Sequence, residues 1–119
     1  MYDAQEADSC LALSAMSMDA LKASSPYYES ISLYINPHSF RSARLACGGV
    51  VEMCLSVARG EIRNGFACVR PPGHHAEPDL AMGFCLLNNA AVAAKVAIKE
   101  CENVKKVMIL DWSVGILDA

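Results

Sequence analysis

The chain has 119 residues, of which 54% are hydrophobic, with a mean hydropathy of +0.25 and a formal net charge of -3. This length suits one small domain with one core and is too short for two. The negative charge excludes a broad basic surface for nucleic acid or an anionic membrane, so any link to chromatin would run through a protein. The hydrophobic content is high for a small domain, and we expect another part or partner to cover some faces.

Six cysteines are spread without a C-x-x-C pair, several of them inside apolar runs: Cys10, Cys47, Cys54, Cys68, Cys85 and Cys101. This spacing favours free thiols in a reducing compartment, with disulfides or a cysteine zinc site as the alternative. The first ten residues lack the features of a secretory signal, and Lys95 and Lys99 interrupt the best candidate for a membrane span. We therefore expect a protein of the nucleus, the cytoplasm or both.

The N-terminal part is predicted to hold a helix over residues 5–23, where apolar residues recur with imperfect helical spacing. Pro26 follows its end. The next stretch, Tyr27–Asn36, alternates weakly between apolar and polar residues. It is predicted to be extended up to Pro37.

A second helix is predicted over residues 39–59, because apolar residues return there at intervals of three and four. Gly48 and Gly49 lie in its middle. Glycine there costs about 1 kcal/mol relative to alanine, so we expect another backbone to approach closely, with an ordinary loose spot as the alternative. Gly60 is well placed to end the helix.

The C-terminal half is predicted to contain a strand, a loop, a helix and a second strand, in this order. Short apolar runs at 65–70 and 105–112 are predicted to be buried strands, and a helix over 88–102 has Asn88 or Asn89 as its N-cap. The helix is expected to pack through Ala90, Ala93, Ala94, Ala97 and Cys101. Such a βαβ unit predicts an α/β fold with a parallel sheet, whose functional residues gather at the carboxyl ends of the strands.

The loop after the first predicted strand contains a Pro-Pro-Gly turn followed by His74 and His75, and Asp111 lies at the end of the second. A rigid turn that holds two imidazoles suits proton transfer or metal ligation, because histidine titrates near neutral pH. The alternative is a loop with two solvated histidines.

The string Arg70–Asn89, RPPGHHAEPDLAMGFCLLNN, resembles the zinc-dependent lysine deacetylases of the histone deacetylase family, and within them the class II branch. The resemblance implies a partial arginase/deacetylase-type three-layer α/β fold with a parallel sheet. It divides the chain into a poorly matched N-terminal helix at 1–26, a truncated deacetylase domain at 27–112 and an unrelated tail at 113–119.

By this resemblance, His74 and His75 match the tandem histidines that manage protons during hydrolysis of acetyl-lysine. Asp111 matches an aspartate that steadies a histidine. Gly83 and Phe84 match the wall of the acyl-lysine channel. Two further residues, Asn36 and His38, are candidates for the channel rim, with a surface position at the helix start as the alternative for His38.

The zinc ligands of the family are the feature that this chain departs from. Where the family has an aspartate and a histidine after the tryptophan, this chain has Ser113 and Gly115. The third ligand and the oxyanion-stabilising tyrosine belong to family segments beyond Ala119. Because zinc needs nitrogen, sulfur or carboxylate donors, we expect no bound zinc and no hydrolysis.

Three hypotheses follow from the sequence. The chain is a catalytically incompetent fragment of a deacetylase whose complete form acts on an acetylated histone or other protein. The second hypothesis is a non-catalytic binding module that engages the partners of a full-length deacetylase, such as subunits of its complex. The third is an intact hydrolase whose divergent metal site is built in an oligomer. An exposed strand edge and uncovered apolar faces predict aggregation or a need for a partner.

Overall fold

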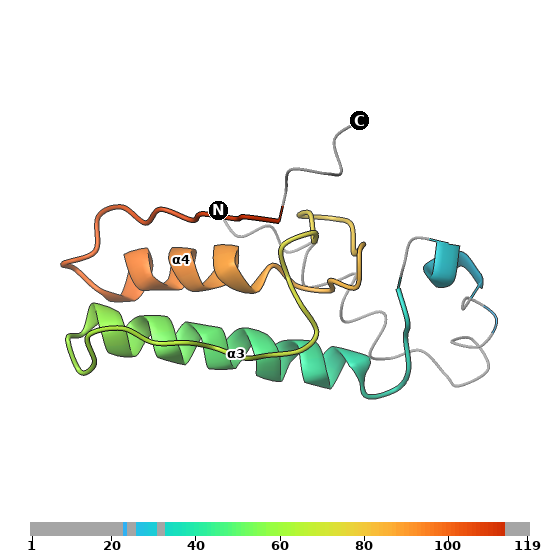
Figure 1. Cartoon of the computed structure of the whole chain (residues 1–119), viewed down its shortest axis with the longest axis horizontal. Coiled ribbons are helices and arrows are strands. Elements are labelled where there is room, and N and C mark those ends of the chain that lie inside the picture. The colour runs from blue at the N-terminus through green and yellow to red at the C-terminus, as the bar shows by residue number, and fades with distance from the viewer. Residues whose placement is uncertain (1–22, 24–25, 31–32, 114–119) are drawn as a thin grey trace.

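The computed structural model describes residues 23, 26–30 and 33–113. Its body is formed by two long helices, α3 (Ser39–Ala58) and α4 (Asn89–Glu100), which pack side by side and run in the same direction (Figure 1). The helix predicted over 5–23 lies outside the described residues except for residue 23.

Helix α3 confirms the helix predicted over 39–59. It begins after a turn in which the Ser39 Oγ accepts from the N–H of Asn36 at 2.9 Å and the Asn36 Oδ1 accepts from the N–H of His38 at 2.8 Å. It ends at Ala58, and Gly60 follows with a φ of 77° that only glycine readily adopts and an N–H that donates to the Val57 carbonyl at 3.0 Å. The buried face consists of Ala43, Ala46, Cys47 and Leu55.

Helix α4 confirms the helix predicted over 88–102 and identifies Asn88 as its N-cap. The Asn88 Oδ1 accepts from the N–H of Ala91 at 3.1 Å, which satisfies one of the free donors at the helix start. Ala93, Ala97 and Cys101 are buried, as predicted, but Ala90 is exposed. Small side chains on this face let α4 lie close to α3.

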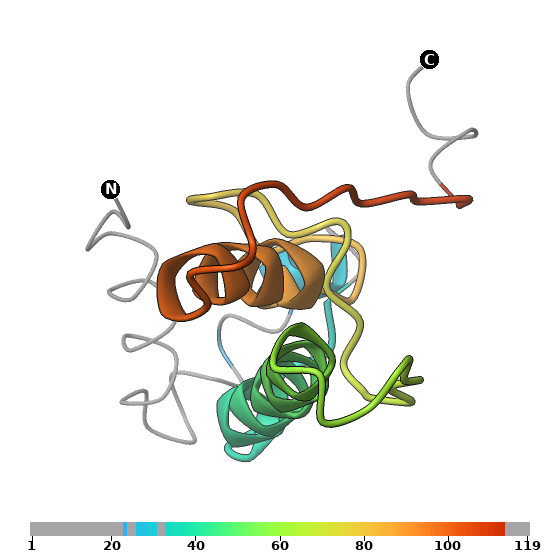
Figure 2. The same cartoon turned by 90° about the vertical axis from the view of Figure 1, so that its left-hand side faces the viewer.

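The two predicted strands, 65–70 and 105–112, are extended and run in the same direction, opposite to the helices (Figure 1). No backbone hydrogen bond joins them, and the part of the chain that the structure describes contains no strand ladder. A ladder requires segments about 5 Å apart, whereas these two pass over different helices (Figures 1 and 2). The predicted parallel sheet is therefore not formed by the described residues.

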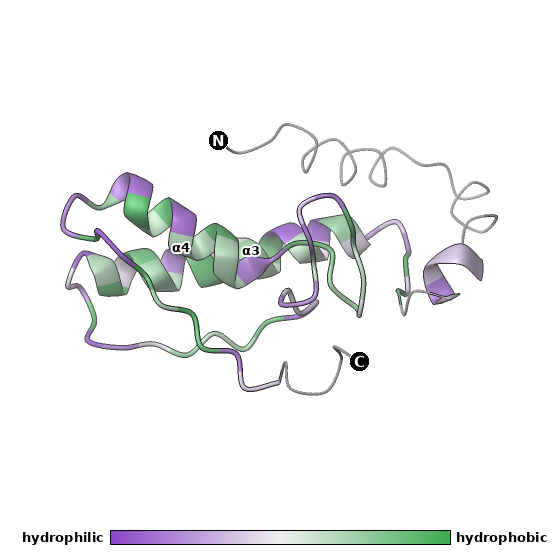
Figure 3. Cartoon of the chain, turned by 90° about the horizontal axis from the view of Figure 1, so that it is seen from above, coloured by the Kyte–Doolittle hydropathy of each residue, from purple (hydrophilic) through white to green (hydrophobic). Residues whose placement is uncertain are grey.

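The segment 105–112 also differs from the prediction in its exposure. It was expected to be a buried strand, yet Met108 is 87% exposed and Trp112 is 89% exposed. In Figure 3 much of this segment is coloured as hydrophobic, and it passes beside the two helices and not between them. The prediction of burial is wrong for this segment and also for 65–70, where Phe66 is 91% exposed, because the described residues provide no layer that covers either one.

The extended prediction for Tyr27–Asn36 is wrong over residues 27–30, which belong to a helical turn at 26–30. Pro26 is compatible with the first turn of a helix, and the Ser30 hydroxyl donates to the Tyr27 carbonyl at 2.6 Å. Leu33 follows and is buried in a small cluster with Ala43 and Leu86.

The two glycines in the middle of α3 do not meet another backbone. A methyl group at Gly48 would have nothing within 4 Å, and one at Gly49 would lie 3.8 Å from the side-chain Cγ1 of Val69. The expected close approach of a backbone is therefore wrong. Gly48 instead fits the alternative interpretation, an ordinary position in the helix interior where no neighbouring backbone requires glycine.

The five cysteines in the described residues are all free thiols, with Cys47, Cys85 and Cys101 buried and Cys68 exposed. This confirms the prediction of free thiols for that part of the chain. Among the described residues, no helix has the length and apolar character needed to cross a membrane.

Gly48 and Gly60 offer a matched test of the helix boundaries, since neither has an atom within 4 Å of the added methyl group. We expect Gly48→Ala to raise the free energy of unfolding by about 1 kcal/mol, because alanine favours the helix interior. We expect Gly60→Ala to lower it by about 1 kcal/mol, because its positive φ disfavours a Cβ atom. Urea unfolding followed by circular dichroism measures both, and equal effects would contradict the assigned end of α3.

Candidate active site

The turn before the two histidines is fixed against the start of α4. Gly73 is buried, and a Cβ atom there would lie 2.5 Å from the backbone nitrogen of Asn89 and 2.6 Å from the carbonyl oxygen of Leu87. Only glycine allows this approach. The Asn89 side chain is also buried, and its Nδ2 donates to the Pro71 carbonyl at 3.3 Å. The turn and the helix therefore set the position from which the next two residues project.

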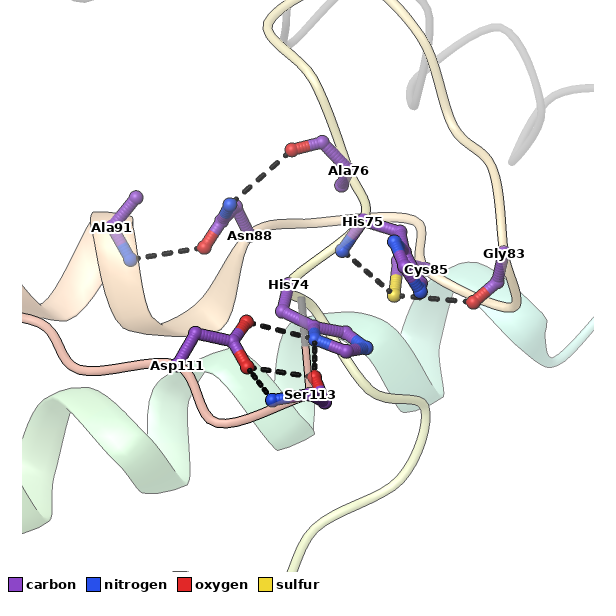
Figure 4. Close-up of polar contacts among 9 residues, drawn as sticks. All are labelled: His74, His75, Ala76, Gly83, Cys85, Asn88, Ala91, Asp111 and Ser113. Atoms are coloured by element: carbon purple, nitrogen blue, oxygen red, sulfur yellow. Dashed lines mark hydrogen bonds and ion pairs between the residues drawn. The ribbon is translucent and has the colours of Figure 1, made fainter. Parts of the chain in front are cut away.

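The structure brings His74 and Asp111 together from the ends of the two extended segments, as the βαβ order predicts. The Nδ1 of His74 lies 2.9 Å from the Oδ2 of Asp111 (Figure 4). Because a carboxylate can only accept, this geometry assigns the proton to Nδ1. The other ring nitrogen, Nε2, is then the one that can accept a proton.

Ser113 closes a small hydrogen-bonded cluster with these two residues. Its Oγ donates to the Oδ1 of Asp111 at 2.7 Å, and its backbone N–H donates to the same oxygen at 2.9 Å. The same Oγ lies 2.9 Å from the Nδ1 of His74, where it can accept a share of that proton (Figure 4). Sequence reasoning identified this position only as a lost ligand, because a hydroxyl two residues after an aspartate carries no specific signal.

The cluster contains serine, histidine and aspartate, but its geometry is not that of a hydrolase triad. In a triad the serine and the aspartate contact opposite nitrogens of the imidazole. Here Ser113 and Asp111 both contact Nδ1 of His74. Ser113 therefore has no base to remove its proton and does not act as a nucleophile in this arrangement.

Asp111 is an exposed carboxylate that its neighbours hold in the ionised form. Hydrogen bonds from the side chain and backbone of Ser113, with a further one from His74, lower the pKa of Asp111 from 3.8 to about 2. A lowered pKa in the folded state stabilises the fold only while the group is ionised. This contribution is fully present above about pH 4 and is lost as the pH falls through 2.

His75 lies beside His74, with ring centroids 4.1 Å apart and a tilt of 44° between the planes. Its backbone N–H donates to the Sγ of Cys85 at 3.4 Å, and burial raises the pKa of this thiol. The ring packs on Gly83, where a Cβ atom would lie 2.6 Å from the Cδ2 of His75. Gly83 was predicted to line the channel, and the structure places it directly behind the second imidazole.

Phe84 has a positive φ of 66° and is 60% exposed. It lines a cleft of about 330 Å³ whose wall also includes Asn36 and His38, the two candidates for the channel rim. The other lining residues are Leu33, Tyr34, Ser39, Ser42, Arg70, Pro71 and Leu86. The structure therefore groups Phe84 with both rim candidates, while the paired histidines do not line this cleft.

The residues that the structure describes do not form a site that fits a zinc ion. The described part of the chain contains no group of three histidine, cysteine, aspartate or glutamate side chains that converge as ligands. Ser113, at the first expected ligand position, offers a neutral hydroxyl that is already bonded to Asp111. Gly115, at the second, lies outside the described residues.

Comparison with known proteins identifies the family to which this chain belongs. The histone deacetylase domain family matches residues 5–115, so the chain belongs to this family. The chain is 55% identical over 84 residues to histone deacetylase HDA1 of Saccharomyces cerevisiae and 55% identical over 85 residues to histone deacetylase 5 of Arabidopsis thaliana. Each alignment covers 70% of this chain, but only 12% and 13% of those relatives. The resemblance to the class II-like branch is confirmed.

The crystal structure of the HDA15 HD domain is similar in fold, with a TM-score of 0.57 and 41% sequence identity. The match covers 74% of this chain and 28% of that domain. This similarity supports the deacetylase-type fold, although the regular secondary structure of the described residues consists of helices and no sheet. The chain thus spans a small part of the relatives it matches.

Removing the Ser113 hydroxyl tests the origin of the low pKa of Asp111. We expect Ser113→Ala to move this pKa upward from about 2 toward 3.8, because one of its hydrogen bonds is lost. Carbon-13 NMR titration of the Asp111 carboxyl group measures the shift. Ser42→Ala, which removes a hydroxyl that lines the cleft, is the matched control. An Asp111 pKa that is unchanged in Ser113→Ala would contradict this account.

Proposed function

We propose that this chain is a segment of a class II-like zinc-dependent lysine deacetylase domain and that it does not hydrolyse acetyl-lysine as it stands. In the complete family this domain hydrolyses N6-acetyl-lysine in histones or other proteins. The observation that carries the proposal is the contact of 2.9 Å between the His74 Nδ1 and the Asp111 Oδ2, with Ser113 at a ligand position.

The paired histidines and Asp111 would serve the proton transfers of the hydrolysis. Asp111 holds the proton of His74 on Nδ1, which leaves Nε2 as the basic atom. His75 would share this work, since its ring lies 4.1 Å from that of His74. Gly83 and Phe84 would form part of the wall for the lysine methylenes, which an aromatic ring contacts through apolar surface.

Catalytic incompetence follows from the chemistry of the donors. When bound, zinc polarises the amide carbonyl and activates water. Ser113 replaces a carboxylate with a neutral hydroxyl, and its hydrogen bonds hold it on Asp111. The residues that handle protons would then lack an activated water to act on.

A second candidate function is a non-catalytic module that binds the partners of a full-length deacetylase. The exposed apolar segment 107–112 favours it, because a contiguous exposed apolar surface marks an interaction site. Subunits of deacetylase complexes are the partners that this function would involve, with a role in chromatin regulation and transcription repression. We place the protein in the nucleus, the cytoplasm or both, without direct contact with nucleic acid or membrane.

Zinc content and turnover test the first proposal directly. We expect the purified chain, after dialysis against zinc, to hold well below one zinc ion per chain by inductively coupled plasma mass spectrometry. We also expect no deacetylation of a fluorogenic acetyl-lysine peptide above the enzyme-free blank, with a complete histone deacetylase as positive control. Stoichiometric zinc with turnover would show that the chain is a competent hydrolase.

Restoring the ligands tests the assignment of the metal positions. We expect the double variant Ser113→Asp with Gly115→His to bind zinc at least about tenfold more tightly than the wild-type chain, because it gains a carboxylate and an imidazole. The matched control is Ser113→Ala with Gly115→Ala, which changes the same positions without adding donors. Isothermal titration calorimetry with zinc chloride reads this out. Equal affinities in the two double variants would show that positions 113 and 115 do not converge.

A further inference from the structure

Cys85 carries a buried thiol that has no part in the proton transfers proposed above. Its side chain is 0% exposed. The Sγ accepts from the backbone N–H of His75 at 3.4 Å and donates to the Gly83 carbonyl at 3.4 Å (Figure 4). One sulfur atom therefore joins the backbone of the second histidine to the turn against which the ring of that histidine packs.

The turn beside the His75 ring is closed by two backbone hydrogen bonds. The N–H of Met82 donates to the Cys85 carbonyl at 3.1 Å, and the N–H of Cys85 donates to the Met82 carbonyl at 2.9 Å. Between them, Gly83 and Phe84 have positive φ angles of 56° and 66°, as the central residues of a type I′ turn do. A Cβ atom at Gly83 would lie 2.6 Å from the Cδ2 of His75. The turn thus presents its bare glycine to the imidazole.

The thiol must keep its proton to make both contacts. A thiol can donate one hydrogen bond and accept another, whereas a thiolate can only accept. Burial raises the pKa of the Cys85 thiol, and hydrogen bonds from the backbone of His75 and Ala76 act in the opposite direction. The S–H group is therefore available at neutral pH to donate to the Gly83 carbonyl.

Water cannot take the place of this sulfur, because the Cys85 side chain is 0% exposed. A buried donor or acceptor that loses its partner is left unsatisfied. Removal of the sulfur would free the N–H of His75 and the carbonyl of Gly83 at the same time. The first histidine is held differently, since its ring Nδ1 lies 2.9 Å from the Oδ2 of Asp111. The two imidazoles therefore depend on different groups for their positions.

We propose that Cys85 is a positioning residue for His75, whose thiol fixes the backbone of this histidine to the Gly83 turn and so sets where its imidazole lies beside His74. The inference rests on the proposed function, in which His75 shares the proton transfers of the hydrolysis. Loss of the thiol should displace the second imidazole and leave the first one on Asp111.

NMR spectroscopy of the full chain tests this role without substrate. We expect Cys85→Ala to speed hydrogen exchange of the His75 amide at least about tenfold, because this N–H loses its acceptor. The cross-peak between the ring Hδ2 of His75 and the Hα protons of Gly83 should weaken, while the Nδ1–H signal of His74 stays in place. The conservative Cys85→Ser should keep the His75 amide protected, because a hydroxyl both donates and accepts.

Cys47→Ala is the matched control, because it also removes a buried thiol, from the packed face of helix α3. We expect it to lower the free energy of unfolding and to leave both His75 signals unchanged. Unchanged His75 signals in Cys85→Ala, or equal changes at His74 and His75, would overturn the proposal. If Cys85→Ala does not fold, Cys85→Ser decides, and loss of the His75 amide protection in that variant would overturn it. Deacetylation by the wild-type chain would contradict the proposed function alone, since these signals are read without turnover.

Discussion

The contact between Gly73 and the start of α4 is the constraint on which the candidate site depends. The absence of a side chain at Gly73 allows the turn to reach the backbone of Asn89, and the buried Asn89 side chain bonds back to Pro71. Since α4 is itself packed on α3, the turn is attached to the rigid body of the molecule. Both imidazoles are therefore placed by the helices, although they lie on a loop.

The helices could be predicted because their signals are local. The spacing of apolar residues, the N-cap at Asn88 and the positive φ at Gly60 all act within one or two turns of the chain. The strands could not be predicted with the same success. A strand needs a neighbour that its own sequence does not specify, and the segments at 65–70 and 105–112 have none among the described residues.

The contact between His74 and Asp111 could be predicted from the sequence, whereas the hydrogen bonds of Ser113 could not. The rule that functional groups gather at the carboxyl ends of parallel segments placed His74 near Asp111, and the two are 2.9 Å apart. The bonds that Ser113 makes with both could not be read from the sequence, since serine is common on exposed loops. The hydroxyl of Ser113 donates to Asp111 at the position where the resemblance predicts a negatively charged metal ligand, so this one residue decides the local chemistry.

The cluster of His74 and Asp111 also has a consequence for how the chain folds. Helices α3 and α4 each form from neighbouring residues, whereas the imidazole and the carboxylate are separated by 37 positions in the sequence. Closing so long a loop has an entropic cost that is recovered only after the helical body exists to hold the turn. We therefore expect the contact between His74 and Asp111 to form after the helix pair and to open before the helices separate.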